Sequence, residues 1–148
     1  MTMTIAEAVP LGTGLHTRWQ TLSAAEPGLR IRDAADRLGV SEAELVATWQ
    51  GDGVRRLQGP WGDLVERLPE IGEVMVLTRN DHAVHEKVGR FGNVSVRGPM
   101  GLVFNREVDL RLFLGRWAFG FAVAEEAQGE TRHSLQFFDA AGTAVHKV

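Results

Sequence analysis

The stretch VMVLTRNDHAVHEK (residues 74–87) decides the fold, because the periodicity of the chain changes here. Before it, apolar residues recur at helical spacing. From Glu73 onward, β-branched and aromatic residues alternate with polar ones. Alternation with a period of two is typical of strands that bury one face. Asn80 and Asp81 predict a turn, so we expect a hairpin of strands 73–79 and 82–88.

Short strands follow this hairpin to the end of the chain. They are expected at residues 94–97, 101–104, 108–114, 117–124, 133–138 and 144–148. Tight turns between sequential strands predict an antiparallel meander. Since the helices come first and the strands afterwards, the expected class is α+β, with N-terminal helices packed on a large antiparallel meander sheet.

The first half of the chain contains the helical patterns. Helices are expected at residues 17–22, 31–38, 41–46 and 61–68, and a loop at residues 51–60. Gly39 ends the second helix, and Ser41 with Glu44 forms a capping box at the start of the third. Residues 1–16 are expected to be a flexible leader, and residues 17–148 a single domain.

Composition excludes several classes of function. The net charge of −3 and a pI near 5.9 give no general attraction to nucleic acid or to an anionic membrane. The absence of Cys excludes disulfides and thiolate chemistry, and the absence of Tyr excludes a phenolate ligand. Neither a secretory signal nor an apolar run long enough to span a bilayer is found, so a cytoplasmic protein is expected.

The two helices at residues 31–46 also allow a DNA-binding helix-turn-helix interpretation. A recognition helix needs Arg, Lys, Asn or Gln near its start to reach bases and phosphates. Here the second helix opens with Glu42 and Glu44, whose carboxylates would repel phosphates. A helical pair that packs on the sheet is therefore the favoured interpretation, with a DNA-binding regulator as the alternative.

The stretch VDLRLFLGRW (residues 108–117) carries the strongest candidate for ligand binding. Its apolar residues alternate strictly, and Arg111 and Phe113 share the opposite face of the strand. A guanidinium group beside an aromatic ring suits a planar anionic ligand. The alternative is that Arg111 pairs with a carboxylate on a solvated face.

His85 is the second candidate. It lies in a strand on the face opposite Val84 and Glu86, and an imidazole can form an axial bond to haem iron. The alternative is a surface or hydrogen-bonded histidine. No HExxH, CxxC, GxSxG or phosphate-binding loop occurs, so the residues alone identify no catalytic centre.

Four stretches resemble the amino-terminal half of the cytoplasmic haem-handling proteins of the HemS, ChuS, PhuS and HmuS type. These stretches are RIRDAADRLGVSEAELVAT (residues 30–48), residues 74–87, residues 108–117 and SLQFFDAAGTAVHKV (residues 134–148). The resemblance extends from about Thr17 to Val148. It implies helices followed by a large antiparallel sheet, repeated twice in the family, with haem held in a cleft.

The resemblance also implies a ligand and residue roles. Family members accept haem from the ABC-transport system of Gram-negative bacteria during iron acquisition, and deliver it to a haem oxygenase or take part in its breakdown. Arg111 matches the distal arginine of the family, Phe113 a neighbouring pocket aromatic, and His85 the histidine of an AVHE motif proposed as a haem ligand. We expect haem trafficking, with haem degradation as an activity of the longer family proteins.

The sequence departs from the family in its length. The principal proximal histidine of the family belongs to a carboxy-terminal repeat that these 148 residues lack. Because the last residues form an apparent strand, we expect that the chain is part of a longer protein and that an open sheet edge favours a homodimer, as in the single-repeat ChuX and HutX relatives. A structural half-domain that binds no ligand of its own is the remaining alternative.

Overall fold

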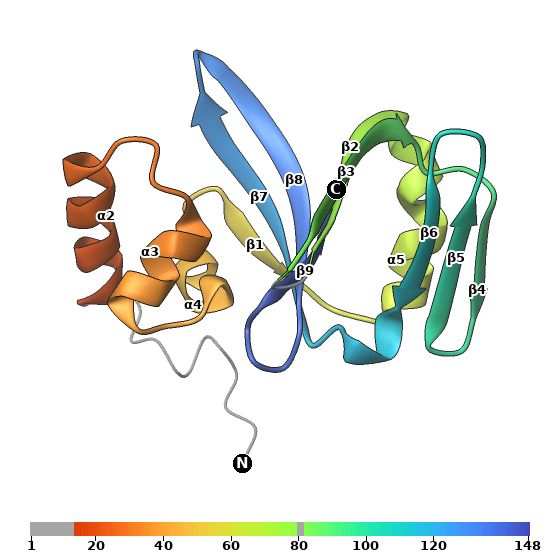
Figure 1. Cartoon of the computed structure of the whole chain (residues 1–148), viewed down its shortest axis with the longest axis horizontal. Coiled ribbons are helices and arrows are strands. Elements are labelled where there is room, and N and C mark those ends of the chain that lie inside the picture. Colours follow the sequence, from red (N-terminus) through yellow and green to blue (C-terminus); the bar gives the residue numbers. More distant parts are fainter. Residues whose placement is uncertain (1–13, 80–81) are drawn as a thin grey trace.

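The computed structural model describes residues 14–79 and 82–148, in which helices come first and strands follow (Figure 1). The α+β class is confirmed, and the strands are divided between a six-stranded and a three-stranded antiparallel sheet. The predicted turn at Asn80 and Asp81 lies outside the described residues, as does most of the predicted leader at residues 1–16.

Three helices form one end of the molecule: α2 (Leu15–Ala25), α3 (Ile31–Leu38) and α4 (Glu42–Ala47). Helix α2 begins at Leu15, inside the stretch assigned to the leader, and ends three residues beyond the predicted Leu22. Gly39 adopts a left-handed conformation with φ 71° and ends α3, as predicted. The capping box of Ser41 and Glu44 is confirmed at the start of α4.

Helix α4 packs against the sheet and buries five of its six residues. Ala43, Val46 and Ala47 contact Phe121 and Phe138 of the sheet in one apolar cluster. A recognition helix needs an exposed face to enter a groove of DNA. The burial of α4 therefore opposes the DNA-binding interpretation and supports the packing of this helix pair on the sheet.

The six-stranded sheet has the order β1-β7-β8-β9-β2-β3. Its strands are β1 (Val54–Leu57), β2 (Glu73–Arg79), β3 (Val84–Arg90), β7 (Phe119–Ala127), β8 (Glu130–Phe138) and β9 (Ala144–Lys147). The prediction of a loop throughout residues 51–60 is wrong, because β1 lies within it. This four-residue strand is too short to show a clear alternation and forms by pairing with β7, more than sixty residues later.

Strand β9 is the seam of this sheet. It joins the long β7–β8 hairpin to the β2–β3 hairpin, and the two hairpins diverge from it in Figure 1. Its pairing with β2 consists of Leu77 with Lys147 and Thr78 with His146. The β2–β3 ladder, in contrast, runs from Glu73 to Arg79 without interruption.

The three-stranded sheet has the order β4-β5-β6, from β4 (Val94–Arg97), β5 (Met100–Phe104) and β6 (Asp109–Phe113). It packs on α5 (Trp61–Arg67), which is followed by the 3-10 helix η1 (Leu68–Ile71); a second 3-10 helix, η2 (Leu114–Arg116), follows β6. The predicted apolar face of residues 108–114 is confirmed, since all four of its members are buried: Val108, Leu110, Leu112 and Leu114. Arg111 is thereby held on the outer face.

The main core lies between the two sheets and contains a stack of rings. The ring centroids of Trp117 and Phe137 are 4.2 Å apart and the two rings are nearly parallel. The ring of His146 stacks on that of Trp117, with 5.7 Å between the centroids. The indole N–H of Trp61 donates to the carbonyl of Trp117 at 2.7 Å. These aromatic contacts hold β8, β9, α5 and the residue that follows η2 in a fixed arrangement.

Candidate functional site

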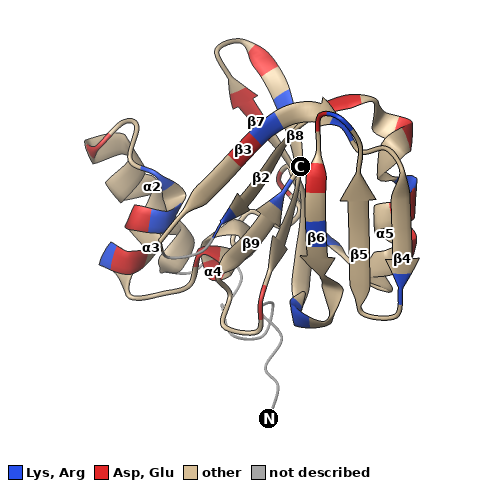
Figure 2. Ribbon diagram, turned by 45° about the vertical axis from the view of Figure 1, so that its right-hand side comes forward, with Lys and Arg blue, Asp and Glu red and all other residues tan. Residues whose placement is uncertain are grey.

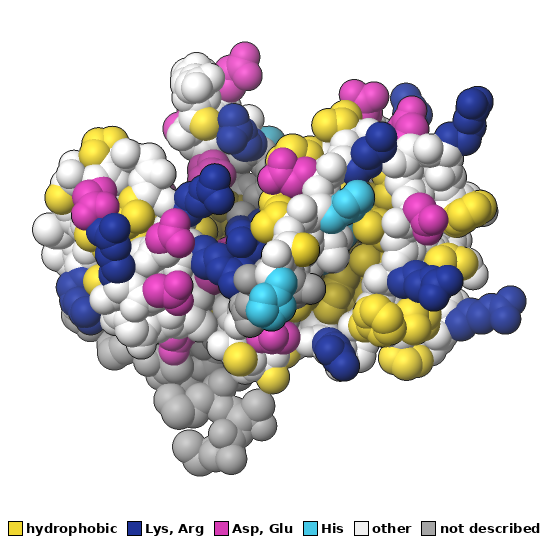
Figure 3. All heavy atoms as spheres, viewed as in Figure 1, with side chains coloured by type: hydrophobic (Ala, Val, Ile, Leu, Met, Phe, Trp, Pro, Cys, Tyr) yellow, Lys and Arg dark blue, Asp and Glu magenta, His cyan; other side chains and the backbone are white. Residues whose placement is uncertain are grey.

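The outer face of the three-stranded sheet combines exposed apolar and cationic side chains. Its members are Ser95, Arg97, Met100, Leu102, Phe104, Asp109, Arg111 and Phe113. Phe104 is 58% exposed and Phe113 54%. In Figure 3, hydrophobic side chains and cations gather over this part of the molecule. Apolar residues that are exposed side by side mark a surface for a ligand or a partner.

Arg111 occupies the middle of β6, opposite Leu102 of β5. No hydrogen bond or ion pair joins its guanidinium to any residue in the described ranges 14–79 and 82–148, although Asp109 lies two residues before it. Figure 2 shows β5 uncharged and β6 with one acidic and one basic band. The structure therefore gives no support to the alternative that Arg111 pairs with a carboxylate on a solvated face. The N–H donors of its guanidinium are available to a ligand.

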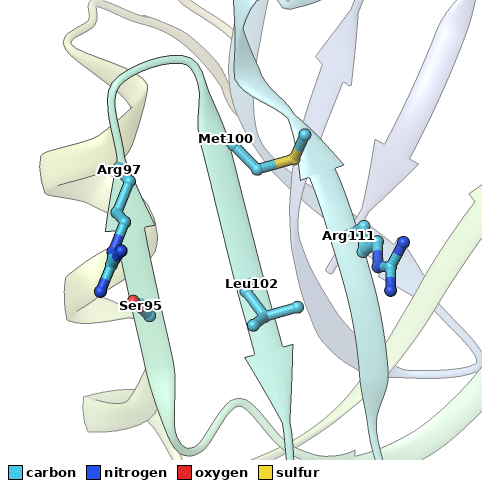
Figure 4. A pocket seen from close by; sticks show the side chains of 5 residues that line it. All are labelled: Ser95, Arg97, Met100, Leu102 and Arg111. Carbon is cyan, nitrogen blue, oxygen red and sulfur yellow. The ribbon is translucent and has the colours of Figure 1, made fainter.

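A shallow depression of about 470 Å³ lies on this face. It is lined by Ser95 and Arg97 of β4, Met100 and Leu102 of β5, and Arg111 of β6 (Figure 4). This volume is within the range of small-molecule sites. Phe113 pairs with Met100 in the ladder and so stands at the margin of the depression.

His85 lies on β3, the edge strand of the other sheet, and is exposed. Its cross-strand neighbour is Thr78, which places the imidazole on the side of the sheet that faces the main core. Strand β3 closely approaches the residues before β6, because a Cβ atom at Gly89 would lie 2.9 Å from Val108 Cγ2. No hydrogen bond or ring contact connects His85 with Arg111 in the described part of the chain. The structure thus joins Arg111 and Phe113 on one face and leaves His85 on the edge strand of the other sheet.

A second hollow, of about 1360 Å³, was not predicted from the sequence. It lies where β2 and β8 diverge beyond the end of β9, and its lining includes Met75, Leu77, His133, Leu135, Lys147 and Val148. It depends on the order of strands that are distant in the chain. The sequence signal that could have indicated it is the difference in length between β9 and its two neighbours.

His146 is the titratable residue that the structure buries most clearly, with 1% of its surface exposed. Its Nδ1 lies 3.1 Å from the hydroxyl of Thr78, and its Nε2 has no hydrogen-bond partner. Burial lowers the pKa of His146 to about 4, because desolvation disfavours the charged imidazolium. His146 is therefore a neutral core residue and not an accessible ligand.

The described residues contain neither a metal-binding cluster nor a membrane-spanning helix. No group of three His, Asp or Glu residues among them could hold a metal ion. None of the helices that the structure describes has the length and hydropathy needed to cross a membrane.

Comparison with known proteins relates this arrangement to one family. The model of the haemin-degrading HemS.ChuX domain matches residues 39–148. The hemin transport protein HmuS of Yersinia pestis is 44% identical over 139 residues, which are 93% of this chain and 40% of HmuS. The chain thus spans about 40% of the length of this curated relative.

Solved structures give the same relationship. Holo-PhuS, a heme-binding protein from Pseudomonas aeruginosa, has a TM-score of 0.87 and 48% identity, and the match covers 98% of this chain and 40% of PhuS. ChuX has a TM-score of 0.72 at 16% identity, with 87% of this chain and 81% of ChuX covered, and shares the fold.

Proposed function

The chain belongs to the HemS.ChuX domain family, and on that premise we propose that it binds haem on the side of β6 that carries Arg111. The observation that carries this proposal is the unpaired guanidinium of Arg111 beside exposed apolar residues in one depression. A haem ring is planar and apolar with two anionic propionates, which this combination of side chains fits. The exposed imidazole of His85, on the edge strand of the other sheet, is the candidate axial ligand.

In this proposal the chain carries haem rather than breaking it down. Arg111 donates charged hydrogen bonds to an anionic group of the ligand, and Phe113 and Leu102 pack against the ring. Carriage and delivery need only binding and release, whereas breakdown requires a reductant and oxygen in addition. We propose that the protein acts in the cytoplasm, takes haem from an ABC importer and passes it to a haem oxygenase, and that a homodimer can complete the site.

A haemin titration followed by absorbance tests the site. Arg111→Ala is expected to raise the Kd about tenfold, because a hydrogen bond to a charged group contributes roughly 1.5 kcal/mol. His85→Ala is expected to shift the Soret maximum of the complex, since the axial bond is lost. The same titration of His133→Ala, which alters the larger hollow instead, should match the wild type.

Other outcomes of this titration are equally informative. Saturable binding that only His133→Ala weakens would place haem in the hollow between β2 and β8 and overturn the β6 site. The absence of any saturable Soret shift would favour the alternative of a structural half-domain that binds no ligand of its own. This alternative is motivated by the match to only 40% of the length of HmuS. Transfer of haem to an apo haem oxygenase, measured by the rate of Soret change, tests delivery separately.

A further inference from the structure

Arg97 of β4 lies on the same exposed face as Arg111, although the sequence alone gave no reason to select it. Strand register arranges the outer face in rows that cross the sheet. One row contains Ser95, Leu102 and Arg111, and the next contains Arg97, Met100 and Phe113. Arg97 and Arg111 are therefore two strands and one row apart.

The spacing of these two cations follows from sheet geometry. Two inter-strand steps and one two-residue step along a strand separate their Cα atoms by roughly 12 Å. Arginine side chains are long, so both guanidinium groups can reach a ligand that lies across β5. Figure 4 shows Met100 and Leu102 on β5 between them. Both methionine and leucine are 38% exposed and form an apolar floor.

Arg97 is also chemically available. No hydrogen bond or ion pair joins its guanidinium to another described residue, and the acidic residue of this face, Asp109, stands opposite Phe104 in a row that does not contain Arg97. The strand places Arg97 on the exposed side because Val94 and Val96 turn inward toward α5 and the core. A guanidinium that is held on a face without a protein partner suits a carboxylate of a ligand.

We propose that Arg97 is a carboxylate-binding residue for a planar dicarboxylate whose ring covers Met100 and Leu102 and lies beside Arg111. This inference rests on the proposed haem-binding function and adds to it a second anchoring residue and the chemical class of the anchored groups. It assigns the recognition of the ligand to its carboxylates and its apolar ring, independently of the metal.

Three porphyrins separate these contributions: haemin, iron-free protoporphyrin IX and haemin dimethyl ester, whose carboxylates are masked. Arg97→Ala is expected to raise the Kd for haemin and for protoporphyrin IX by about three- to fivefold, as for a solvent-exposed charge pair. It should leave the Kd for the dimethyl ester unchanged. His85→Ala should affect the two iron porphyrins alone.

Two variants serve as matched controls. Arg97→Lys retains the charge and should recover part of the affinity for haemin. Arg67→Ala removes an equal charge from α5, on the opposite side of the β4–β6 sheet, and should behave as the wild type with all three porphyrins. Equal losses for haemin and its dimethyl ester in Arg97→Ala, or no difference between Arg97→Ala and Arg67→Ala, would overturn the role of Arg97.

Failure of this inference is distinguishable from failure of the proposed function. If the wild type binds haemin and Arg97→Ala binds it with the same Kd, the role of Arg97 is overturned and the haem site stands. The absence of wild-type binding to all three porphyrins would overturn both the role of Arg97 and the haem site. Weakened binding at raised ionic strength for haemin, but not for its dimethyl ester, would support the carboxylate contacts independently of any substitution.

Discussion

Replacement of Lys147 by methionine is expected to lower the free energy of unfolding by about 3 kcal/mol at pH 7. The ammonium group of Lys147 lies 2.6 Å from Oε2 of Glu42, whose side chain is 5% exposed. Methionine has a similar length but no charge, so it would leave the carboxylate of Glu42 buried without a counter-charge. Urea denaturation at pH 7 measures this change directly.

An exposed ion pair provides the matched control. Arg67 and Glu70 lie 3.4 Å apart with side chains 78% and 64% exposed, so Arg67→Met should change the stability by only about 0.5 kcal/mol. The double variant Glu42→Gln with Lys147→Met removes the unpaired charge and should recover most of the loss. A Lys147→Met variant as stable as Arg67→Met would show that the pair between α4 and β9 contributes little.

The stability of the protein is expected to fall by about 3 kcal/mol between pH 6.5 and pH 4 because of His146. Burial holds the pKa of His146 at about 4 in the folded chain, whereas 6.5 is its ordinary value. Between pH 6.5 and pH 4, His146 therefore binds a proton in the unfolded chain but stays neutral in the folded chain. Lowering the pH through this range therefore favours unfolding. The aromatic rings around His146 and the hydroxyl of Thr78 carry no charge that would oppose this effect.

Comparison of denaturation midpoints at pH 7 and pH 5 tests this linkage. The wild type should lose roughly 2 kcal/mol over this interval through His146, and His146→Gln should lose that much less, whatever its stability at pH 7. His133→Gln replaces an exposed histidine and should keep the wild-type dependence. An equal pH dependence in the wild type and in His146→Gln would contradict the role of burial.

Local patterns predicted the parts of this molecule that depend on local physics. The strict alternation of residues 108–114 placed Arg111 and Phe113 on an exposed face, and the capping box at Ser41 fixed the start of α4. The α-helices and the strands other than β1 were indicated in the same way. Each of these features is determined by residues a few positions apart.

Features that depend on pairing across the chain were not predictable. Strand β1 forms through β7, and Glu42 meets Lys147 across 105 residues. Arg97 alternates with valines, which indicates its face, yet only the order β4-β5-β6 brings it beside Arg111. The roles of His85, Arg111 and Phe113 toward haem remain predictions that the titrations above test.

The seam formed by β9 has a consequence for motion in the molecule. The β2–β3 and β7–β8 hairpins each keep a long internal ladder, but β2 meets β9 at only two residue pairs. The angle between the hairpins is therefore governed less by backbone hydrogen bonds than by the side chains beneath them, including Phe137 and Val76. We therefore expect the two hairpins to pivot about this short pairing, so that substitutions that change the volume of the core would change the width of the hollow between them.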